Sequence, residues 1–469
     1  MSHSVLKLNP CRQSLYGIVY RSWSSEATRL KRKDNSELTS NRKQKTPGKP
    51  NRLEKEIRNF FQANSNETIL GQLPAEMLNQ CPKQTDRLYI GTPECASIVQ
   101  KHVTAGLSKN TLLAEVNPGP GLLTRELLNS GMQKLLLIEG DEYFEPTLRN
   151  LMASHSDTDW SFKVANFNGH WRHMYYECED NRKKIRHLLE GIPKKRWKDE
   201  PNLRLFSIVD SAKFFKSMVS SLAAQTGLFS LGRCEMVLIV PPLTYVQFTS
   251  TKEAGYNLYR QHSVLFQLLF EHELLTTIPR KHILPWASNP TKRKVRTERA
   301  RYEQLQKDEW YLMRIVPRQN LHDFCSPDNL KLLKFFVYQH LISRKNRIVP
   351  AMEKWIPYCG ARLILNQNYV PSGAELEREE SLPLFLQKSS PLRKNDLPER
   401  VTIFTEFGEL TPSQILAVFD RFISWPEFQQ SPFIQSAEQY QKRPLSVLKQ
   451  SSDAIADEEE DHEEDSNRT

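Results

Sequence analysis

Two acidic residues bracket a glycine loop in this chain, and their spacing could serve a nucleotide-like ligand. Glu115 ends an apolar run and opens the loop, in which Gly119 and Gly121 alternate with prolines, and Glu139 ends the next apolar run. Glycines in such a loop let a ligand approach backbone that a Cβ would block. An acid at the end of the second run can accept both hydroxyls of a ribose. The pattern predicts a site for an adenosine-containing cofactor.

These residues fall where a strand–helix–strand unit would place them. Leu112–Val116 and Lys134–Glu139 are apolar runs of strand length, Leu122–Leu128 is apolar at helical spacing, and Gly131 stands where a helix would end. The order implies a parallel sheet with a right-handed crossover. Thr124 takes the place of the third glycine of an NAD motif, and an acid opening the loop suits S-adenosylmethionine instead. A tight turn without any ligand is the alternative.

Further apolar runs extend this unit into an α/β domain over residues 53–304. A basic and aromatic stretch at about 170–200 is interpreted as an insertion. The expected elements are two strands, the helix between them and a later amphipathic helix: Leu203–Val209, Met236–Val240, Phe214–Leu222 and Tyr256–Glu273.

After these strands the patterns are helical only. Ser326 is the expected N-cap of a helix that runs through His340. Thr411–Gln414 has the composition of a capping box, with apolar residues following at helical spacing. We therefore expect a smaller, mostly helical second domain over residues 305–445.

Charge is distributed unevenly along the chain. The 469 residues carry a formal net charge of +10, although the expected disordered tail, residues 446–469, is strongly acidic. A body this basic favours an anionic partner, with nucleic acid first, and a merely solvated basic surface is the alternative. The candidate nucleic-acid contacts are clusters of basic residues with one tryptophan: Lys194, Lys195, Arg196, Trp197, Lys292, Arg293, Lys294, Arg344, Lys345 and Arg347.

The N-terminus has the composition of a targeting sequence. Residues 1–25 are basic, rich in serine and free of Asp and Glu, which predicts a mitochondrial transit peptide, and a basic linker over residues 26–52 follows. The seven cysteines include no C-x-x-C pair, so neither a disulfide framework nor a metal site is expected. No apolar run approaches the roughly 20 residues that span a bilayer.

The glycine loop also resembles that of a known family. Glu115–Thr124 is similar to the E-x-G-P-G-x-G-x-L-T motif of the rRNA adenine dimethyltransferases, and Ile138–Asp141 to their second motif. Tyr89–Ile90 falls where their N-terminal cofactor motif lies. The resemblance, over about residues 85–425, implies an α/β, Rossmann-like class I S-adenosylmethionine methyltransferase domain followed by a smaller, mostly helical domain. The implied cofactor-binding residues are Ile90, Glu115, Asn117, Gly119, Gly121, Glu139 and Asn166.

The residues that would hold the reacting adenine are missing. The family places Asn-Leu-Pro-Tyr or Asn-Leu-Pro-Phe at a strand end, where acceptors position the amine and the ring stacks on the base. The expected strand ends are Ser207–Asp210 and Ile239–Pro242, and Ile208 stands where the asparagine should be. Asn117 replaces a loop glycine, and Asn166 replaces an acid expected near the adenine. We expect weak or lost methyl transfer and assign no catalytic residue.

Other segments resemble the branch of the family that serves mitochondrial transcription. This likeness is carried by the asparagine of Asn117–Gly121, by Pro317–Leu321 and by Gly191–Pro193. The basic Arg344–Arg347 resembles signals of the wider family around its small helical domain. It implies an initiation factor of the mitochondrial matrix and nucleoid that binds mitochondrial RNA polymerase and promoter DNA and assists promoter melting. One alternative is an active dimethyltransferase of adjacent adenines in mitochondrial small-subunit rRNA. Another is an assembly factor that binds rRNA without chemistry.

Overall fold

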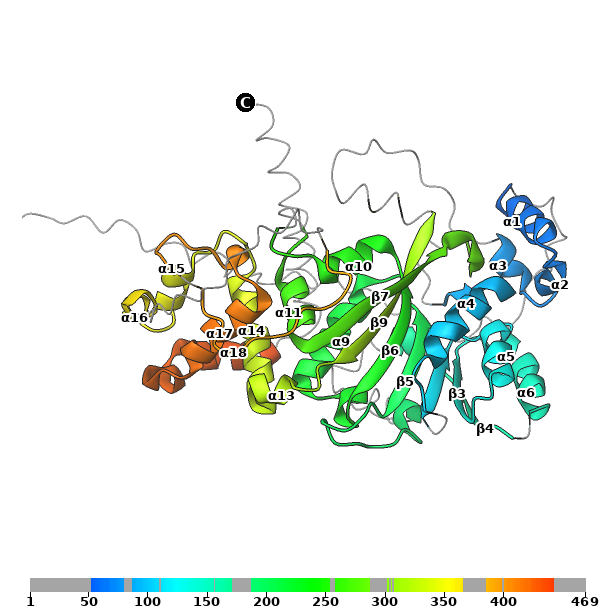
Figure 1. Ribbon diagram of the computed structural model, residues 1–469, viewed down its shortest axis with the longest axis horizontal. Coiled ribbons are helices and arrows are strands. Elements are labelled where there is room, and N and C mark those ends of the chain that lie inside the picture. Colours follow the sequence, from blue (N-terminus) through cyan, green and yellow to red (C-terminus); the bar gives the residue numbers. More distant parts are fainter. Residues whose placement is uncertain are drawn as a thin grey trace, which may run out of the picture. The chain divides into compact units, whose positions relative to one another are not determined.

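A seven-stranded mixed sheet organises the first part of the chain (Figure 1). Its strand order is β4-β3-β2-β5-β6-β9-β7, in which the first five strands are parallel and β9 runs antiparallel to both of its neighbours. This confirms the expected α/β class. The bounds are Leu112–Val116 for β2, Lys134–Glu139 for β3, Asp159–Val164 for β4, Leu203–Ile208 for β5, Cys234–Val240 for β6, Phe270–Pro279 for β7 and Glu309–Pro317 for β9.

The computed structural model describes most of the chain outside its ends. The expected transit peptide, nearly all of the basic linker, the acidic tail and Lys292, Arg293 and Lys294 lie outside the described residues. Within these residues no helix is both long and apolar enough to cross a membrane. The described ranges are 52–79, 87–108, 111–155, 157–170, 187–253, 258–286, 302, 305, 308–365, 385–398 and 400–442.

Helices cover both faces of the sheet because its central strands are buried on both sides. Leu113 and Leu135 point into one core, whereas Ala114 and Leu136 point into the other, as the two-residue period of a strand requires. The first core is closed by α1 (Arg52–Ala63), α2 (Glu67–Leu70), α3 (Ala75–Asn79), α4 (Pro93–Thr104), α5 (Leu122–Asn129) and α6 (Glu145–Ala153). The second is closed by α9 (Ala212–Ala224), α10 (Pro242–Thr249) and α11 (Gln261–Leu269).

A two-stranded ribbon fastens the segment before α4 to the segment after β7. β1 (Tyr89–Ile90) pairs antiparallel with β8 (Ile283–Leu284). The Gly91 amide donates to the His282 carbonyl at 2.7 Å, which extends the pairing by one residue. The ribbon therefore fixes the backbone of Tyr89.

The C-terminal helices share a continuous apolar core with the second face of the sheet. The expected capping box at Thr411 is confirmed, because its hydroxyl accepts from the Gln414 amide at 3.2 Å and the Gln414 side chain accepts from the Thr411 amide at 2.9 Å. Ser326 instead precedes a 3-10 turn, Pro327–Asn329, and caps nothing with its side chain. The helices are α13 (Leu321–Phe324), α14 (Leu330–His340), α15 (Ile348–Glu353), α16 (Cys359–Leu365), α17 (Pro412–Ile423) and α18 (Pro432–Lys442).

Two expected elements differ from the structure. The helix expected to run to Glu273 ends at Leu269, and the chain continues as β7 because Phe270 turns to extended backbone and pairs with Pro317. The strand β9, which pairs with β6 and β7, falls inside the range expected to form the helical domain. The region without sheet strands therefore begins after Pro317 rather than near residue 305.

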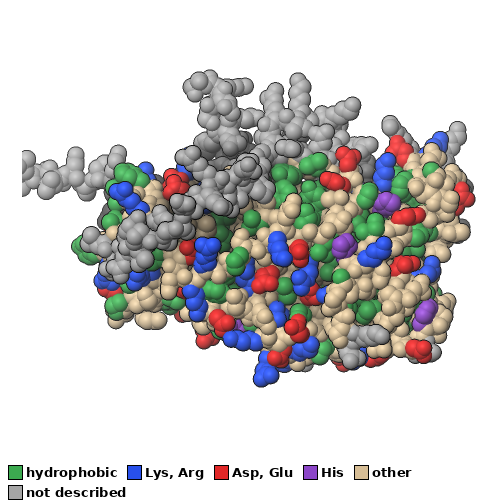
Figure 2. Space-filling model, viewed as in Figure 1, with side chains coloured by type: hydrophobic (Ala, Val, Ile, Leu, Met, Phe, Trp, Pro, Cys, Tyr) green, Lys and Arg blue, Asp and Glu red, His purple; other side chains and the backbone are tan. Residues whose placement is uncertain are grey.

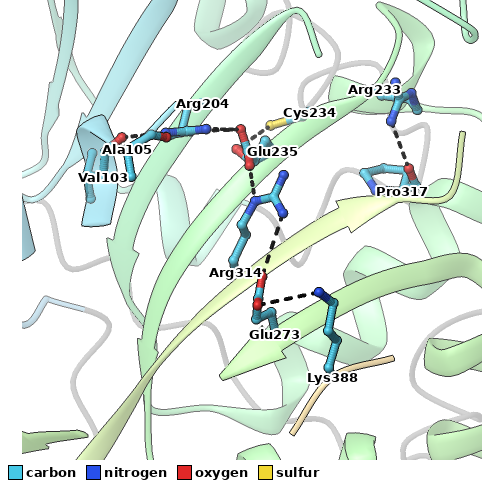
Figure 3. Close-up of polar contacts among 10 residues, drawn as sticks. All are labelled: Val103, Ala105, Arg204, Arg233, Cys234, Glu235, Glu273, Arg314, Pro317 and Lys388. Atoms are coloured by element: carbon cyan, nitrogen blue, oxygen red, sulfur yellow. Dashed lines mark hydrogen bonds and ion pairs between the residues drawn. The ribbon is translucent and has the colours of Figure 1, made fainter. Parts of the chain in front are cut away.

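Charged side chains alternate across four neighbouring strands (Figure 3). Arg204 on β5 meets Glu235 on β6 at 2.7 Å, and Arg314 on β9 binds the other oxygen of the same carboxylate. Glu273 on β7 forms ion pairs with Arg314 at 3.9 Å and with Lys388 at 3.7 Å. Arg204 and Glu235 are buried, so this pair lies on the sheet with little water to screen it.

Candidate cofactor and nucleic-acid sites

The glycine loop leaves the carboxyl end of β2 and turns sharply into α5. Asn117, Gly119 and Gly121 all have positive φ, at 55°, 58° and 75°. Asparagine is among the few side chains that adopt this left-handed conformation at low cost, which accounts for Asn117 in a position where the family has glycine. The Asn117 amide donates to the Ile138 carbonyl at 2.8 Å and ties the loop to β3.

Glu139, the expected ribose acceptor, is engaged with donors of the protein itself. Its side chain lies at the end of β3 and is only 1% exposed. One oxygen accepts from the Gly119 amide at 3.0 Å, and the other accepts from the Asp141 amide at 2.8 Å and from the Tyr89 hydroxyl at 3.4 Å. Burial raises the pKa of Glu139, and the two amide bonds act against that rise.

Gly119 makes room for Tyr89. A Cβ built on Gly119 would lie 2.5 Å from Cδ1 of the buried Tyr89 ring, closer than carbon atoms approach. At Gly121 a Cβ would lie 3.0 Å from Leu151 and 3.2 Å from Leu148, both on α6. Internal packing therefore requires both glycines, whether or not a ligand is bound.

Glu115 lies under the loop rather than in an open pocket. Its side chain is 2% exposed and accepts a hydrogen bond from the Thr124 hydroxyl at 2.7 Å. Burial raises the pKa of Glu115 to about 8, partly offset by this hydrogen bond. Folding therefore favours the protonated form of this carboxyl group. Thr124, in the place of a third glycine, has a defined role as its partner.

The two remaining expected cofactor residues lie at the same edge of the sheet. Ile90 is buried and pairs with Ile283 in the β1–β8 ribbon. Asn166 follows β4 and its side-chain oxygen accepts from the Gly169 amide at 2.9 Å. The Gly140 α-carbon faces this turn so closely that a Cβ would lie 3.2 Å from the Asn166 amide nitrogen. The structure thus gathers the expected cofactor residues at the carboxyl ends of β2, β3 and β4.

β5 ends at Ile208, the position where the resemblance expects an asparagine. The side chain of Asn168, which the sequence pattern did not single out, also lies at this strand end. Asn168, which is 6% exposed, donates to the Ile208 carbonyl at 3.2 Å and accepts from the Ser207 hydroxyl at 3.2 Å. A backbone carbonyl that could accept from an adenine amine is therefore bonded to the protein. The available signal was a second asparagine two positions after Asn166, just beyond a strand.

The residues expected for an S-adenosylmethionine site lie together, and two of them already have partners within the protein. The loop and the acid Glu139 stand where the resemblance requires them. Tyr89 fills the space over Gly119, and Glu139 accepts from the protein's own donors. A ribose that binds Glu139 therefore shares its carboxylate with the amides of Gly119 and Asp141.

Comparisons with known proteins identify the class. The profile of the ribosomal RNA adenine dimethylase family matches residues 95–380, and the chain belongs to this family, with its Rossmann-like methyltransferase fold. It is 35% identical over 377 residues to the mitochondrial dimethyladenosine transferase 2 of Drosophila melanogaster, covering 78% of this chain and 82% of the relative. It is 26% identical to the Homo sapiens protein of the same name, covering 49% of this chain and 57% of the relative.

Similarity to solved proteins is more distant. The dimethyladenosine transferase from Plasmodium falciparum is 9% identical, covering 69% of this chain and 94% of that chain, with a TM-score of 0.39.

The first basic cluster is partly structural. Lys194 and Arg196 are exposed, and Arg196 pairs with Asp199 at 3.5 Å. The Lys195 ammonium instead donates to the Pro201 carbonyl at 3.1 Å. Trp197 stacks on His322 at 4.5 Å between ring centroids and donates to the Arg318 carbonyl at 3.0 Å. Trp197 therefore fastens this segment to α13.

The second basic cluster divides in a similar way. The Arg344 guanidinium points inward and donates to the carbonyls of Lys252 at 2.7 Å and Gly408 at 3.0 Å. Lys345 and Arg347 are exposed. Figure 2 shows basic and acidic side chains interspersed over the visible face, without a continuous basic belt.

A cavity of about 990 Å³ opens at the opposite edge of the sheet, far from the cofactor residues along each strand. Its lining includes Leu112, Lys134 and Asp159, which begin β2, β3 and β4. Ligands of open α/β sheets bind at the carboxyl ends of the strands, so this cavity is not the expected cofactor site. In the described residues no group of three or more His, Cys, Asp or Glu side chains is arranged to hold a metal ion.

Proposed function

We propose that this protein is a mitochondrial transcription initiation factor with weak or lost S-adenosylmethionine-dependent rRNA adenine N6,N6-dimethyltransferase activity. In this proposal it binds mitochondrial RNA polymerase and promoter DNA in the matrix nucleoid and assists promoter melting. The observation that carries the proposal is the end of β5, where Ile208 replaces the asparagine of the family and Asn168 occupies its carbonyl.

Loss of the asparagine and the aromatic ring that hold the adenine should lower the rate of methyl transfer. The amine of adenine is a poor nucleophile, so the enzyme must hold it in line with the methyl group. Positioning of this kind supplies roughly 7–11 kcal/mol of barrier reduction in well-oriented reactions. Without the acceptor and the stacking ring, methyl transfer falls by several orders of magnitude.

Binding needs fewer of the missing groups than catalysis does. A factor that holds melted DNA needs basic side chains along the backbone and apolar or aromatic groups for displaced bases. The exposed Lys194, Arg196, Lys345 and Arg347 can supply the first. We therefore expect affinity for nucleic acid to fall steeply with salt.

A second candidate function is an active dimethyltransferase of adjacent adenines in mitochondrial small-subunit rRNA. Membership of the rRNA adenine dimethylase family supports it, as does the presence of Glu139 and both loop glycines. The engaged state of Glu139 argues against it.

Run-off transcription from a mitochondrial promoter with purified polymerase separates these candidates. The wild type and Glu139→Gln are compared, after both are shown to be folded, and the same samples are assayed for single-turnover methylation of small-subunit rRNA. We expect equal stimulation by both proteins and negligible methylation by either. Absence of stimulation together with rRNA methylation by the wild type would establish the second candidate instead.

A further inference from the structure

Two large apolar side chains in the loop over residues 402–405 are exposed to solvent. Ile403 is 51% exposed and Phe404 is 64% exposed. The loop holds this shape by its own hydrogen bonds: the Thr402 hydroxyl accepts from the Phe404 amide at 3.2 Å, and the Thr405 hydroxyl accepts from the Thr402 amide at 2.9 Å. The exposure of the Phe404 ring is therefore set by an ordered turn. Adjacent exposed apolar residues are a common mark of a binding surface.

A basic segment from elsewhere in the chain lies beside this loop. The Ile348 amide donates to the Thr405 carbonyl at 2.9 Å, and the Phe407 amide donates to the Asn346 carbonyl at 2.9 Å. These backbone bonds fix Arg347 next to Phe404, with its guanidinium carbon 5.2 Å from the ring centroid. One face of the ring thus carries a cation, while most of the ring remains in solvent.

Two cations and two acids lie near the Phe404 ring. Lys345 and Arg347 are exposed. Glu406 and Glu409 belong to the next turn, where each side chain accepts from the backbone amide of the other residue. Their carboxylates accept from the backbone of that turn, whereas the Arg347 guanidinium lies beside the Phe404 ring.

We propose that Phe404 and Arg347 form a stacking site for one unpaired nucleotide. The base lies on the open part of the Phe404 ring, and Arg347 and Lys345 contact the flanking phosphates. Base–aromatic stacking tolerates any base and requires a face that a duplex hides, so the site selects single strands over duplexes. The Arg347 cation beside the ring favours a nucleic acid over an apolar protein partner. This inference rests on the proposed function, since it names the surface that captures a displaced strand.

The test measures binding of the full chain to a fluorescein-labelled 12-nucleotide single strand and to the same sequence as duplex. We expect Phe404→Ala to weaken single-strand binding about 5- to 150-fold, as loss of one stacked base does, with little change for the duplex. Phe404→Trp should keep the affinity, and its emission should be quenched by the single strand beyond any quenching in the wild type. The matched control is Tyr143→Ala, since Tyr143 is 51% exposed but lies beside β3.

Salt dependence separates the two roles within the site. Arg347→Gln should lower the slope of log affinity against log salt by about 0.7 for a single strand, as loss of one phosphate contact does. Phe404→Ala should leave that slope unchanged. Equal single-strand binding by wild type and Phe404→Ala would overturn the proposal. So would normal oligonucleotide binding combined with weakened polymerase binding, because the surface would then dock protein.

The proposed function can fail without this site failing. If the wild type does not stimulate transcription but Phe404→Ala loses single-strand binding, the stacking site stands and the initiation role is wrong. If the wild type stimulates transcription while Phe404→Ala binds single strands normally, only the stacking site is refuted.

Discussion

The ring of Tyr89 lies directly over the α-carbon of Gly119, where a Cβ would come within 2.5 Å of Cδ1. Pairing of Tyr89 with Leu284 fixes its backbone, and the ring packs against Phe144 at 5.2 Å between centroids. The glycine of the cofactor loop thus accommodates an aromatic side chain of the protein itself.

We predict that Gly119→Ala destabilises the fold more than a glycine replacement that only strains the backbone. The left-handed φ costs about 1–2 kcal/mol, and overpacking against Tyr89 adds about 1–3 kcal/mol. Gly106 provides the matched control, because it also has positive φ, at 63°, but a Cβ built on it would meet nothing within 4 Å. Urea unfolding of both alanine variants gives the comparison, and equal losses would show that Tyr89 does not fill this space.

The contacts of Glu139 within the protein also predict that S-adenosylhomocysteine, the product of the cofactor, stabilises the fold only weakly. A ligand that binds only the native state stabilises it by RT ln(1 + [L]/Kd), which is about 0.4 kcal/mol when the concentration equals Kd. We expect S-adenosylhomocysteine at about 1 mM to give no more than this, because Glu139 already accepts from Gly119 and Asp141. Thermal unfolding with and without ligand checks it. Stabilisation by 2 kcal/mol or more would mean that Tyr89 moves aside easily.

The strands that position the candidate site could be predicted from the sequence. The side chains of the protein that contact its residues could not. The apolar runs gave the bounds of β2 and β3 residue for residue, because buried parallel strands are nearly continuous in apolar residues. These strands place Glu139 at the carboxyl edge. The contacts of Tyr89 with Gly119 and of Asn168 with Ile208 join residues distant in sequence. Local spacing carries no information about such contacts.

The same limit explains why the expected helix extends past Leu269 to Glu273. Residues 270–279 include glutamate, histidine, threonine and proline, and they lack the apolar run that revealed the central strands. They form β7 because β9 pairs with them along their length. Residues 385–390 then cover the far edge, where the Leu274 amide donates to the Gln387 carbonyl at 2.7 Å. A strand that is stabilised by residues far along the chain need not have an apolar pattern in its own sequence.

Glu115 should make stability depend on pH. Its folded pKa of about 8 lies above the ordinary value of 4.5, so folding favours the protonated form. The stability from this group is complete below about pH 4.5 and is lost as pH rises through 8, at up to about 1.4 kcal/mol per pH unit. Glu115→Gln keeps a partner for Thr124 and removes the titration. The wild type should therefore lose stability relative to this variant between pH 5 and pH 8, and parallel curves from denaturant unfolding would contradict the assignment.

The buried ion pair of Arg204 with Glu235 predicts an asymmetric response to mutation. Glu235→Ala leaves the buried Arg204 without its carboxylate and should cost about 3–5 kcal/mol in the free energy of unfolding. Arg314→Ala should cost much less, because that side chain is 44% exposed and water replaces its partner. Arg204→Met combined with Glu235→Leu should recover much of the loss, since neither charge is then buried alone. Equal losses for the first two variants in urea would show that burial of the pair does not matter.

Substitution of Trp197 should affect stability, whereas substitution of its basic neighbours should affect nucleic-acid binding. Trp197→Phe keeps a ring over His322 but loses the bond to the Arg318 carbonyl, so we expect a loss of about 1 kcal/mol in stability and unchanged affinity for promoter duplex. Lys194→Ala and Arg196→Ala remove exposed charges, so each should lower the salt slope of duplex binding by about 0.9 with little effect on unfolding. Binding titrations at several salt concentrations test both expectations. The opposite result, a changed slope for Trp197→Phe and none for the basic variants, would place the tryptophan on the nucleic acid and the two cations in solvent.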